Sequence, residues 1–352
     1  MTNNKNPASE MQYANYVEKG ISNNARFNLS DPINRDDSNY PYWLLREQLL
    51  SHEVELNTSD VNKGRHVEFE LHMNAIRKEL TVPAFVLLME TEQICPSNAS
   101  QDLLAQYQKI FTWNDDLVDQ RRYIKINFPN KRNSHFELGW SSRDEFCCLI
   151  AGNKSSARRT TKDLYSERVR TIRWFEQNVP DRFDLYGSGW EVSPPPPGWL
   201  GKLWLRTARL GAHQVGRKAF PSYRGKVVDK LETLRKYRFA VCYENVKDMP
   251  GYITEKIFDC FFSGCVPVYW GASNITDYIP KECFIDRREF RDHESLYSLL
   301  SGMSEADYRK YQSAIAHFLE SDAALPFYAE TFANTVALAI LSDLKILTKG
   351  DS

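Results

Sequence analysis

The stretch "GYITEKIFDCFFSGCVPVYWG", residues 251–271, predicts a helix followed by a strand. After Lys256 comes an apolar run typical of a buried helix, then Gly264, and then a second apolar run that ends at Gly271 and is typical of a buried strand. Glu255 and Lys256 place opposite charges side by side in the first helical turn. Since the element that follows is almost wholly apolar, this charged pair requires an explanation.

The strand before this stretch supplies one. "RFAVCYEN" (238–245) is followed by the loop "ENVKDMPGYIT" (244–254), in which Thr254 or a neighbour caps the helix. In a parallel α/β sheet, ligands bind beyond the carboxyl ends of strands, and the free N–H groups of a helix N-terminus suit phosphate. Lys256 would add a full positive charge there, while Glu255 would accept hydrogen bonds from sugar or ribose hydroxyls. The pair therefore favours a nucleotide-sugar site, although such residues also occur at helix starts without a ligand.

The second half of the chain repeats the alternation of strand and helix. "FCCLIAGN" (146–153) and "FDLYGSGW" (183–190) read as strands on either side of the amphipathic helix "LYSERVRTIRWFEQN" (164–178). Such alternation predicts a parallel sheet covered on both faces. The composition turns polar just before the first of these strands, which predicts a domain boundary there. We therefore expect two α/β domains, 1–140 and 141–352. The second would include C-terminal helices that pack on it or cross back to the first.

The first half carries similar but less regular signals. A helical spacing of apolar residues occurs in 41–52, and two apolar runs, 67–73 and 84–90, predict strands. "KIFTWNDDLV" (109–118) begins as another strand and ends in a polar loop. Residues 1–40 are rich in Asn, Asp and Ser, so we predict a loose lead-in with at most one strand.

Composition excludes several classes of protein. With 42% hydrophobic and 13% aromatic residues, the 352-residue chain is globular, and a formal net charge of −1 argues against a dedicated nucleic-acid binder. Its seven cysteines are odd in number, and several lie in apolar runs, which is typical of buried thiols in a reducing compartment. The polar start "MTNNKNPASE" is not a signal peptide, and the apolar runs are too short to cross a membrane. We expect a cytoplasmic protein, which leaves room for peripheral contact with a membrane.

The run "RFAVCYENVKDMPGYITEKIFDCFFSGCVPVYWG", residues 238–271, resembles the signature of the α-1,3-fucosyltransferases of glycosyltransferase family 10, especially its bacterial members. "FTWNDDLVD" (111–119) and "YRGKVVDKLETLRKYRF" (223–239) also look like bacterial sequences of that family. The resemblance covers most of 85–290, and the first eighty residues match only loosely.

This resemblance implies a GT-B fold, in which two Rossmann-like domains face a cleft. It implies an acceptor-binding N-terminal domain, a C-terminal domain that binds GDP-β-L-fucose, and transfer of L-fucose with inversion to a glycan hydroxyl. O3 of N-acetylglucosamine is the expected acceptor atom, giving an α-1,3 linkage. GDP-fucose is then the donor substrate, and neither a cofactor nor a metal is expected. The alternatives are transfer from another GDP-sugar and a family member that only binds a sugar nucleotide or glycan.

The general base expected from the resemblance is a glutamate after an apolar strand of the first domain. "FVLLMETEQICPSN" offers Glu90 and Glu92, and bacterial relatives carry the glutamate four positions before a proline, which favours Glu92 because of Pro96. Many members have Glu-Ser where this chain has Ile-Cys before the proline, so Glu90 stays open. Both would lie on one face of a strand, and their ranking rests on the proline spacing alone.

The resemblance also implies the groups that would hold the donor. Arg224 in "SYRGK" is similar to the family arginine that contacts the pyrophosphate, with Lys226 or Arg217 as alternatives. Together with Lys256 it would stabilise the charge that grows on the departing GDP. The expected donor-binding set is Arg224, Glu244, Asn245, Tyr252, Thr254, Glu255, Lys256, Asn153 and Lys226; weaker candidates are Tyr165, Ser166, Arg168, Gly187 and Gly189.

Acidic pairs such as those in "WNDDLVD" look superficially like the Asp-x-Asp of metal-dependent glycosyltransferases. Acidic pairs in polar loops are mostly helix caps or solvated turns, however, and the histidines and cysteines show no ligand spacing. We therefore expect no metal site.

Overall fold

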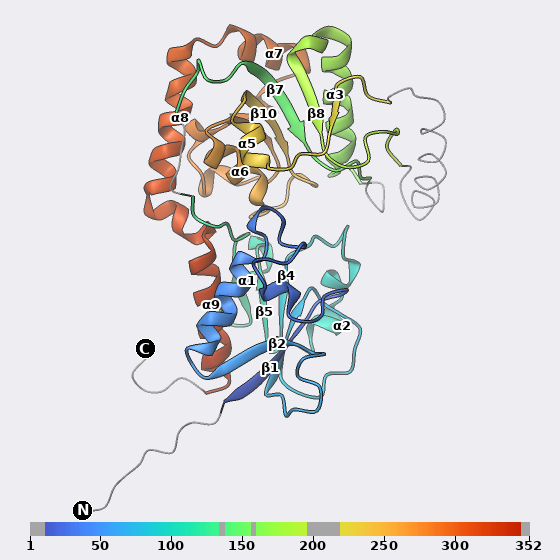
Figure 1. Ribbon diagram of the computed structural model, residues 1–352, viewed down its shortest axis with the longest axis vertical. Coiled ribbons are helices and arrows are strands. Elements are labelled where there is room, and N and C mark those ends of the chain that lie inside the picture. Colours follow the sequence, from blue (N-terminus) through green and yellow to red (C-terminus); the bar gives the residue numbers. More distant parts are fainter. Residues whose placement is uncertain (1–10, 134–137, 156–159, 196–218, 346–352) are drawn as a thin grey trace, which may run out of the picture. The chain divides into compact units, whose positions relative to one another are not determined.

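Two compact units make up the chain in the computed structural model, which describes residues 11–133, 138–155, 160–195 and 219–345 (Figure 1). The first unit comprises Met1–Arg132 and Pro326–Ser352, and the second comprises Asn133–Leu325. This grouping differs from the division expected at residue 140, because the last part of the chain returns to the first unit. The assignment of acceptor and donor binding to the two parts stays a prediction.

The first unit is built on a six-stranded parallel sheet in the order β2-β1-β3-β4-β5-β6. Side chains alternate between its faces, so that Phe85 and Leu87 enter one core while Val86 and Leu88 enter another. The bounds are β1 Gln12–Val17, α1 Tyr40–Leu50, β2 Val54–Thr58, β3 Phe69–Met73, β4 Ala84–Leu88, α2 Gln101–Leu104, β5 Lys109–Thr112, β6 Tyr123–Lys125 and α9 Ala329–Asp343.

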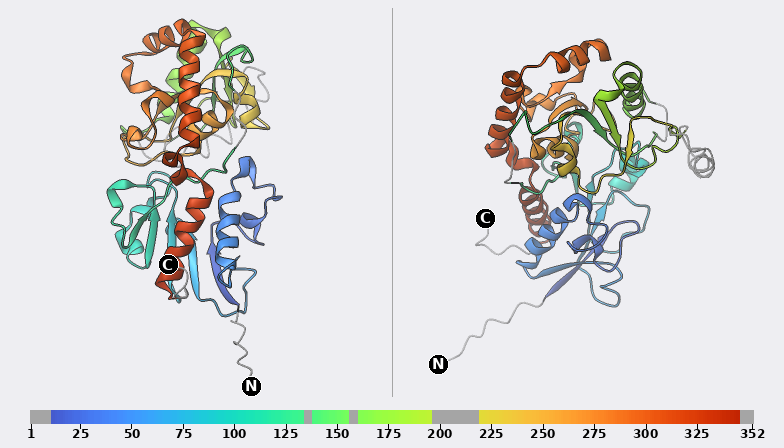
Figure 2. Two further views of the ribbon diagram at one scale, coloured as in Figure 1. Left: turned by 90° about the vertical axis from the view of Figure 1, so that its left-hand side faces the viewer. Right: turned by 45° about the horizontal axis from the view of Figure 1, so that its top comes forward.

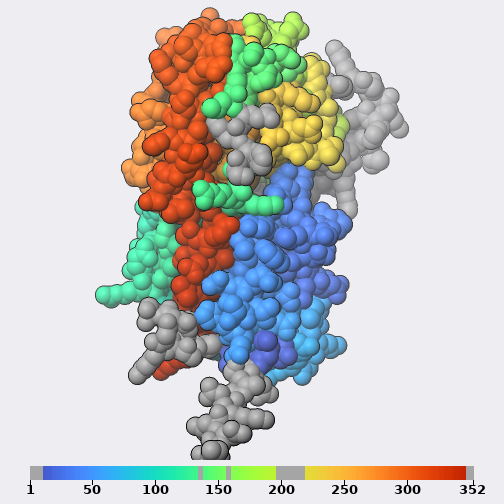
Figure 3. Space-filling model, turned by 60° about the vertical axis from the view of Figure 1, so that its left-hand side comes forward, coloured from blue at the N-terminus to red at the C-terminus, as the bar shows by residue number. Residues whose placement is uncertain are grey.

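The C-terminal helix α9 explains why the chain returns to the first unit. Its buried residues, among them Val336 and Ile340, join the core formed by α1 and the sheet. Figures 2 and 3 show α9 beside α1. Burial of this apolar face stabilises the return of the chain, at about 25 cal/mol for each Å² of apolar surface removed from water.

The second unit contains another six-stranded parallel sheet, in the order β12-β11-β10-β7-β8-β9. From β7 the chain builds outward through β8 to β9, and from β10 it builds in the opposite direction to β12. This is the Rossmann order, in which ligands bind at the carboxyl ends of the two strands where the direction reverses, here β7 and β10. The bounds are β7 Glu145–Ile150, α3 Tyr165–Asn178, β8 Phe183–Tyr186, β9 Tyr223–Gly225, α5 Lys230–Leu234, β10 Tyr237–Tyr243, α6 Glu255–Ser263, β11 Val266–Trp270, β12 Ile285–Asp286, α7 His293–Gly302 and α8 Glu305–Glu320.

Helices cover both faces of the second sheet. Phe239, Val241 and Tyr243 of β10 pack in one core with residues of α3 and α7. The intervening Cys242 faces the opposite side, where α6 contacts β10 and β11. These contacts confirm the expected α/β architecture with a parallel sheet covered on both faces. The structure also confirms the strands predicted at 146–153 and 238–245 and the helix predicted at 164–178.

A buried arginine ties the helices of the second unit to its sheet. Arg143 is 1% exposed, and its guanidinium donates hydrogen bonds to the carbonyl oxygens of Leu234, Tyr237 and Ser263 at 3.3, 3.0 and 2.6 Å. Leu234 ends α5 and Ser263 ends α6, so one cation satisfies the last carbonyls of two helices.

We expect Arg143→Met to lower the free energy of unfolding by roughly 3 kcal/mol or more, because several buried carbonyls lose their donor at once. Urea unfolding of the purified protein measures this loss. Arg170→Met is the control, since that side chain is 68% exposed on α3 and its loss should change stability by under about 0.5 kcal/mol. Equal effects of the two substitutions would contradict the anchoring role.

Candidate functional site

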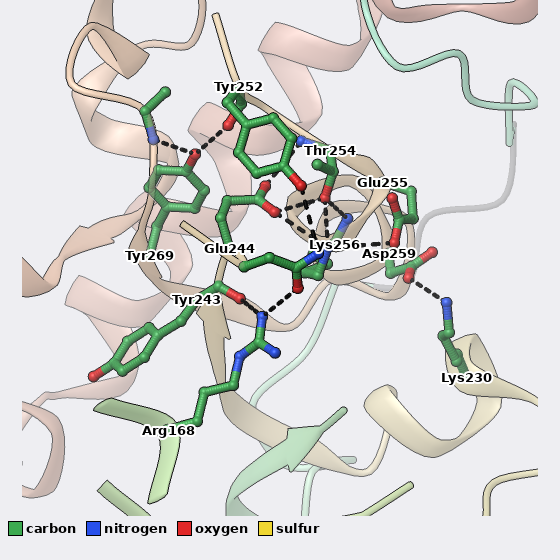
Figure 4. A network of polar contacts seen from close by, with 12 residues as sticks. Arg168, Lys230, Tyr243, Glu244, Tyr252, Thr254, Glu255, Lys256, Asp259 and Tyr269 are labelled. Atoms are coloured by element: carbon green, nitrogen blue, oxygen red, sulfur yellow. Dashed lines mark hydrogen bonds and ion pairs between the residues drawn. The ribbon is translucent and has the colours of Figure 1, made fainter. Parts of the chain in front are cut away.

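The carboxyl end of β10 leads directly into a buried carboxylate, that of Glu244 (Figure 4). One oxygen, Oε1, accepts the backbone N–H of Thr254 at 2.8 Å, and Oε2 accepts the Thr254 hydroxyl at 2.8 Å. Thr254 is the N-cap of α6, and its hydroxyl oxygen accepts the backbone N–H of Lys256. Glu244 therefore fixes the start of α6 relative to the end of β10.

Lys256 completes this arrangement. Its ammonium lies 3.2 Å from Glu244 Oε2 and 2.8 Å from the Thr254 hydroxyl, and 3.5 Å from Glu255 Oε1. Burial lowers the pKa of Lys256, but the carboxylates of Glu244 and Glu255 outweigh burial and raise it, so the side chain is charged at neutral pH. An ammonium has three N–H donors. Glu244 and Thr254 take two of them, the Glu255 carboxylate lies at ion-pair distance from the same ammonium, and the Lys256 side chain is 25% exposed.

Glu255 is the first residue of α6, and its side chain is 47% exposed. Its pKa is lowered to about 2: burial raises it, and the positive charges of Lys256 and Lys230 more than compensate. An ionised, half-exposed carboxylate accepts hydrogen bonds and donates none. The adjacent acidic and basic residues are therefore both charged, and they differ in the partner that each can bind.

A second group of contacts holds the residue after Glu244. Arg168 of α3 is 4% exposed, and its guanidinium donates to Tyr243 O at 2.5 Å and to Asn245 Oδ1 at 3.1 Å. The Asn245 amide in turn donates to the Tyr252 hydroxyl at 3.4 Å. Burial lowers the pKa of Arg168. The helix of the first β-α turn is thereby joined to the loop that leads to α6.

Close packing at the end of β11 supports the same loop. The Tyr269 hydroxyl donates to the carbonyl oxygen of Tyr252 at 3.5 Å and accepts the backbone N–H of Ala272 at 3.1 Å. A Cβ atom at Gly271 would overlap the Tyr269 hydroxyl and the side chain of Glu244. Only glycine fits there, because any side chain would displace the buried carboxylate.

The structure brings six of the expected donor-binding residues together: Glu244, Asn245, Tyr252, Thr254, Glu255 and Lys256. These six residues have different roles at the site. Glu244 and Thr254 are buried and satisfied by each other and by Lys256, so they position the site. Glu255 and Lys256 are the members of the set with exposed charge.

Asn153 lies at the end of β7, on the other side of the strand reversal. It is 6% exposed, and its amide donates to the carbonyl oxygens of Gly189 and Val192 at 2.8 and 2.9 Å. Its Oδ1 is buried and has no hydrogen-bond partner among the residues that the structure describes. Asn153 therefore holds the loop after β8 and retains one unsatisfied acceptor near the expected binding edge.

The structure does not join the two expected cations of 223–226 to the Lys256 network. Arg224 lies on the edge strand β9, where its guanidinium forms an ion pair with Asp184 of β8 at 2.5 Å, and its side chain is half exposed. Lys226 is exposed in the loop after β9. The third candidate, Arg217, lies outside the described residues.

The candidate bases lie just beyond β4 in the first unit. Glu92 is exposed in a turn, whereas Glu90 is half-buried. The backbone N–H of Glu90 donates to Asn74 Oδ1 at 3.0 Å, and its carbonyl oxygen accepts the Asn98 amide at 2.8 Å. Because β4 ends at Leu88, the expected alternation of a strand does not apply to either glutamate.

Sequence reasoning missed Lys230 and Tyr269 at the site. Lys230 opens α5 and pairs with Asp259 of α6 at 3.1 Å, which places its charge near Glu255. A lysine at the start of a short helix gives no distinct signal. Tyr269 sits in the quoted "VPVYWG", where its buried position suggested only core packing.

The part of the chain that the structure describes contains neither a cluster of metal ligands nor a membrane-spanning helix. There, no three side chains from His, Cys, Asp and Glu gather as a metal site would require. None of the helices described is both long and apolar enough to cross a membrane.

Comparison with known proteins agrees with this geometry. Residues 208–321, which include the whole Glu244–Lys256 network, match the family model for glycosyltransferase family 10 (fucosyltransferase), C-terminal part. The alpha-(1,3)-fucosyltransferase FucT of Helicobacter pylori is 39% identical over 69 residues, which cover 19% of this chain and 14% of that protein. This chain thus matches only a small part of that relative's length. The expected resemblance is confirmed for this region.

Two crystal structures of an α1,3-fucosyltransferase share the fold. The one with GDP has a TM-score of 0.54 at 13% identity, covering 99% of this chain and 93% of that one. The one with GDP-fucose has a TM-score of 0.53 at 14% identity, covering 97% and 91%. The fold is that of the GT-B glycosyltransferases, as expected from the sequence.

Proposed function

We propose that this protein is a fucosyltransferase that transfers L-fucose from GDP-β-L-fucose to a hydroxyl of a glycan acceptor, with inversion at the anomeric carbon. The observation that carries the proposal is the paired charge at the start of α6, held by Glu244 at the carboxyl end of β10. It lies within the region that matches the fucosyltransferase family.

The two charges suit the two parts of the donor. The partly exposed ammonium of Lys256 and the start of α6 bind the pyrophosphate, because both present positive charge to it. The ionised carboxylate of Glu255 accepts hydrogen bonds from ribose or fucose hydroxyls. With Asn245 and Tyr252 fixed in the same loop, these groups bind one end of a nucleotide sugar.

Lys256 also has a part in the chemistry. As the bond from the anomeric carbon to the β-phosphate oxygen breaks, negative charge grows on GDP, and a fixed ammonium stabilises that charge. In this proposal Arg224 or Lys226 supplies a second positive charge, and Arg224 must first exchange its Asp184 partner for phosphate. Asn153 contributes at the end of β7 by holding the loop after β8 beside the expected donor site.

The acceptor side of the proposal rests on the first unit. A carboxylate after β4, Glu92 in our assignment, accepts the proton of the acceptor hydroxyl as that oxygen bonds to the anomeric carbon. Two features of Glu92 support this: its side chain is exposed, and it belongs to a hydrogen-bonded turn. The α-1,3 linkage follows the name of the similar fucosyltransferase, and O3 of N-acetylglucosamine as the acceptor atom is carried over from the resemblance of the sequence to family 10.

The deciding experiment supplies GDP-fucose with a panel of oligosaccharides containing N-acetylglucosamine and follows GDP release. We expect GDP release that depends on the acceptor, with an α-linked fucoside as product. GDP-mannose under the same conditions tests the alternative donor. Binding of GDP-fucose without release against every acceptor would instead favour a protein that only binds sugar nucleotides.

A further inference from the structure

We infer that Asn74 and Asn98 are positioning residues that hold the turn carrying the catalytic carboxylate, an inference that rests on the proposed function. The turn runs from Glu90 to Asn98, directly after β4, and contains Glu92. Asn74 stands at the equivalent place after the neighbouring strand β3. We call this pair of asparagines the Asn74–Asn98 clamp.

Asn74 fixes the start of the turn. Its Oδ1 accepts three donors: the backbone N–H groups of Met89 and Glu90, at 3.1 and 3.0 Å, and the amide of Asn98, at 2.8 Å. The residue has a φ of 62°, a left-handed conformation that asparagine tolerates better than most other residues. The left-handed backbone of Asn74 costs free energy, and the same residue has a side chain that accepts three hydrogen bonds at once.

Asn98 closes the turn from its other end. Its amide reaches both Asn74 Oδ1 and the carbonyl oxygen of Glu90, each at 2.8 Å, and its Oδ1 accepts the backbone N–H of Ala75 at 2.9 Å. The Ser97 hydroxyl also donates to the carbonyl oxygen of Ala75. Asn98 is 7% exposed, so these bonds are largely shielded from water.

The backbone within the turn is also bonded to itself. The carbonyl oxygen of Thr91 accepts the N–H groups of Ile94 and Cys95 at 3.0 and 2.8 Å, and that of Cys95 accepts the N–H of Asn98 at 3.0 Å. The Thr91 side chain is buried, while that of Glu92 is exposed. The turn thus carries an exposed glutamate on a backbone held by several hydrogen bonds, which suits a general base.

The clamp serves whichever of the two glutamates removes the proton. Glu90 is bonded to it directly, and Glu92 lies two residues further within the same turn. A displacement of about 1 Å at a reacting group can cost as much as 10²-fold in rate. Loss of the clamp should therefore slow the chemical step and leave donor binding in the second unit unchanged.

Two isosteric substitutions separate the loss of the clamp's hydrogen bonds from the effect of an added charge. Asn98→Asp removes the amide donor to Glu90 and Asn74, and we expect kcat to fall about tenfold or more with the GDP-fucose Kd unchanged. Asn74→Asp adds the same charge but keeps an oxygen that can accept all three donors, so its loss in kcat should be at most severalfold. An equal loss from both substitutions would mean that the added charge is the cause, and it would overturn the inference.

Asn62→Asp controls for the loss of any buried amide. Asn62 is 2% exposed in the same unit, and its amide donates to Ala14 O and Asn15 Oδ1 at 2.9 and 3.0 Å, away from the turn. We expect Asn62→Asp to lower the melting temperature with kcat within about twofold of the unmodified protein. An unchanged kcat in Asn98→Asp would contradict the inference.

Ser97→Ala decides the matter if Asn98→Asp does not fold. It deletes one hydroxyl that bonds to Ala75, and we expect a severalfold lower kcat with only a small fall in the melting temperature; no change in kcat would overturn the inference. The unmodified protein must first release GDP with an acceptor. Its failure to do so would refute the proposed function, whereas an active protein with unaffected clamp variants would refute only the clamp.

Discussion

Replacing Lys256 by alanine should weaken the binding of GDP and of GDP-fucose by ~1.5–3 kcal/mol, the range for a hydrogen bond to a charged group, or roughly 10- to 150-fold in Kd. The ammonium is fixed by Glu244 and Thr254 before any ligand arrives, so little of its interaction with phosphate is spent on ordering the side chain. Isothermal titration calorimetry with GDP measures the effect. Lys310→Ala, which removes a 78% exposed lysine of the same unit, is the matched control and should leave affinity unchanged.

Lower affinity of the Lys256→Ala variant for GDP could also come from lower stability of the fold, and the two effects must be separated. The substitution leaves the fully buried carboxylate of Glu244 without its counter-charge, which lowers stability as well. The double variant Glu244→Gln/Lys256→Met removes both charges, and we expect it to recover most of the stability while GDP still binds weakly. If GDP binds Lys256→Ala as tightly as the unmodified protein, the charged pair at the start of α6 serves only to cap the helix.

Local sequence signals predicted much of the second unit. The apolar run of 238–245, the Thr254 cap and the glycine after α6 each act within a few residues, and all three stand where they were expected. The charged pair after Thr254 was likewise correctly placed at the start of a helix. Such features depend on backbone preferences that the chain carries locally.

The features that sequence reasoning missed depend on contacts between distant residues. Strands β2 and β6 were not predicted, because "VELNT" and "YIK" are short and carry too few apolar residues for a clear alternation. Sequence reasoning left open whether the final helices pack on the second unit or cross back. The return of α9 to the first unit depends on which apolar face it meets, and a helical period does not specify that. The positioning part of Glu244 was hidden for the same reason, since its partners lie ten and twelve residues further along the chain.

The assignment of the base rested on the spacing to Pro96, and the structure adds a physical contrast between the candidates. Glu90 is half-buried with its backbone held by the Asn74–Asn98 clamp, while Glu92 is exposed in the same turn. A base must reach a hydroxyl of an incoming acceptor. Exposure therefore supports Glu92 as the base, while the backbone hydrogen bonds of Glu90 help to hold the turn.

Glu92→Gln should lower turnover by roughly 10²- to 10⁴-fold, because the amide keeps the shape of the side chain and cannot accept the proton. Binding of GDP-fucose should survive, since the groups that we propose to hold the donor belong to the second unit. Measured together, donor Kd by calorimetry and acceptor-dependent GDP release should separate binding from chemistry. Glu79→Gln removes another exposed carboxylate of the first unit and should have no effect on either.

Glu90→Gln completes this test, because it separates the two carboxylates of one turn. We expect a much smaller loss than for Glu92→Gln, since the backbone bonds of Glu90 to the clamp do not involve its carboxylate. The reverse result, with Glu90→Gln inactive and Glu92→Gln near normal, would shift the assignment of the base by two residues. Full activity of both variants would refute the carboxylate mechanism itself, because the turn would then hold no group that removes the proton.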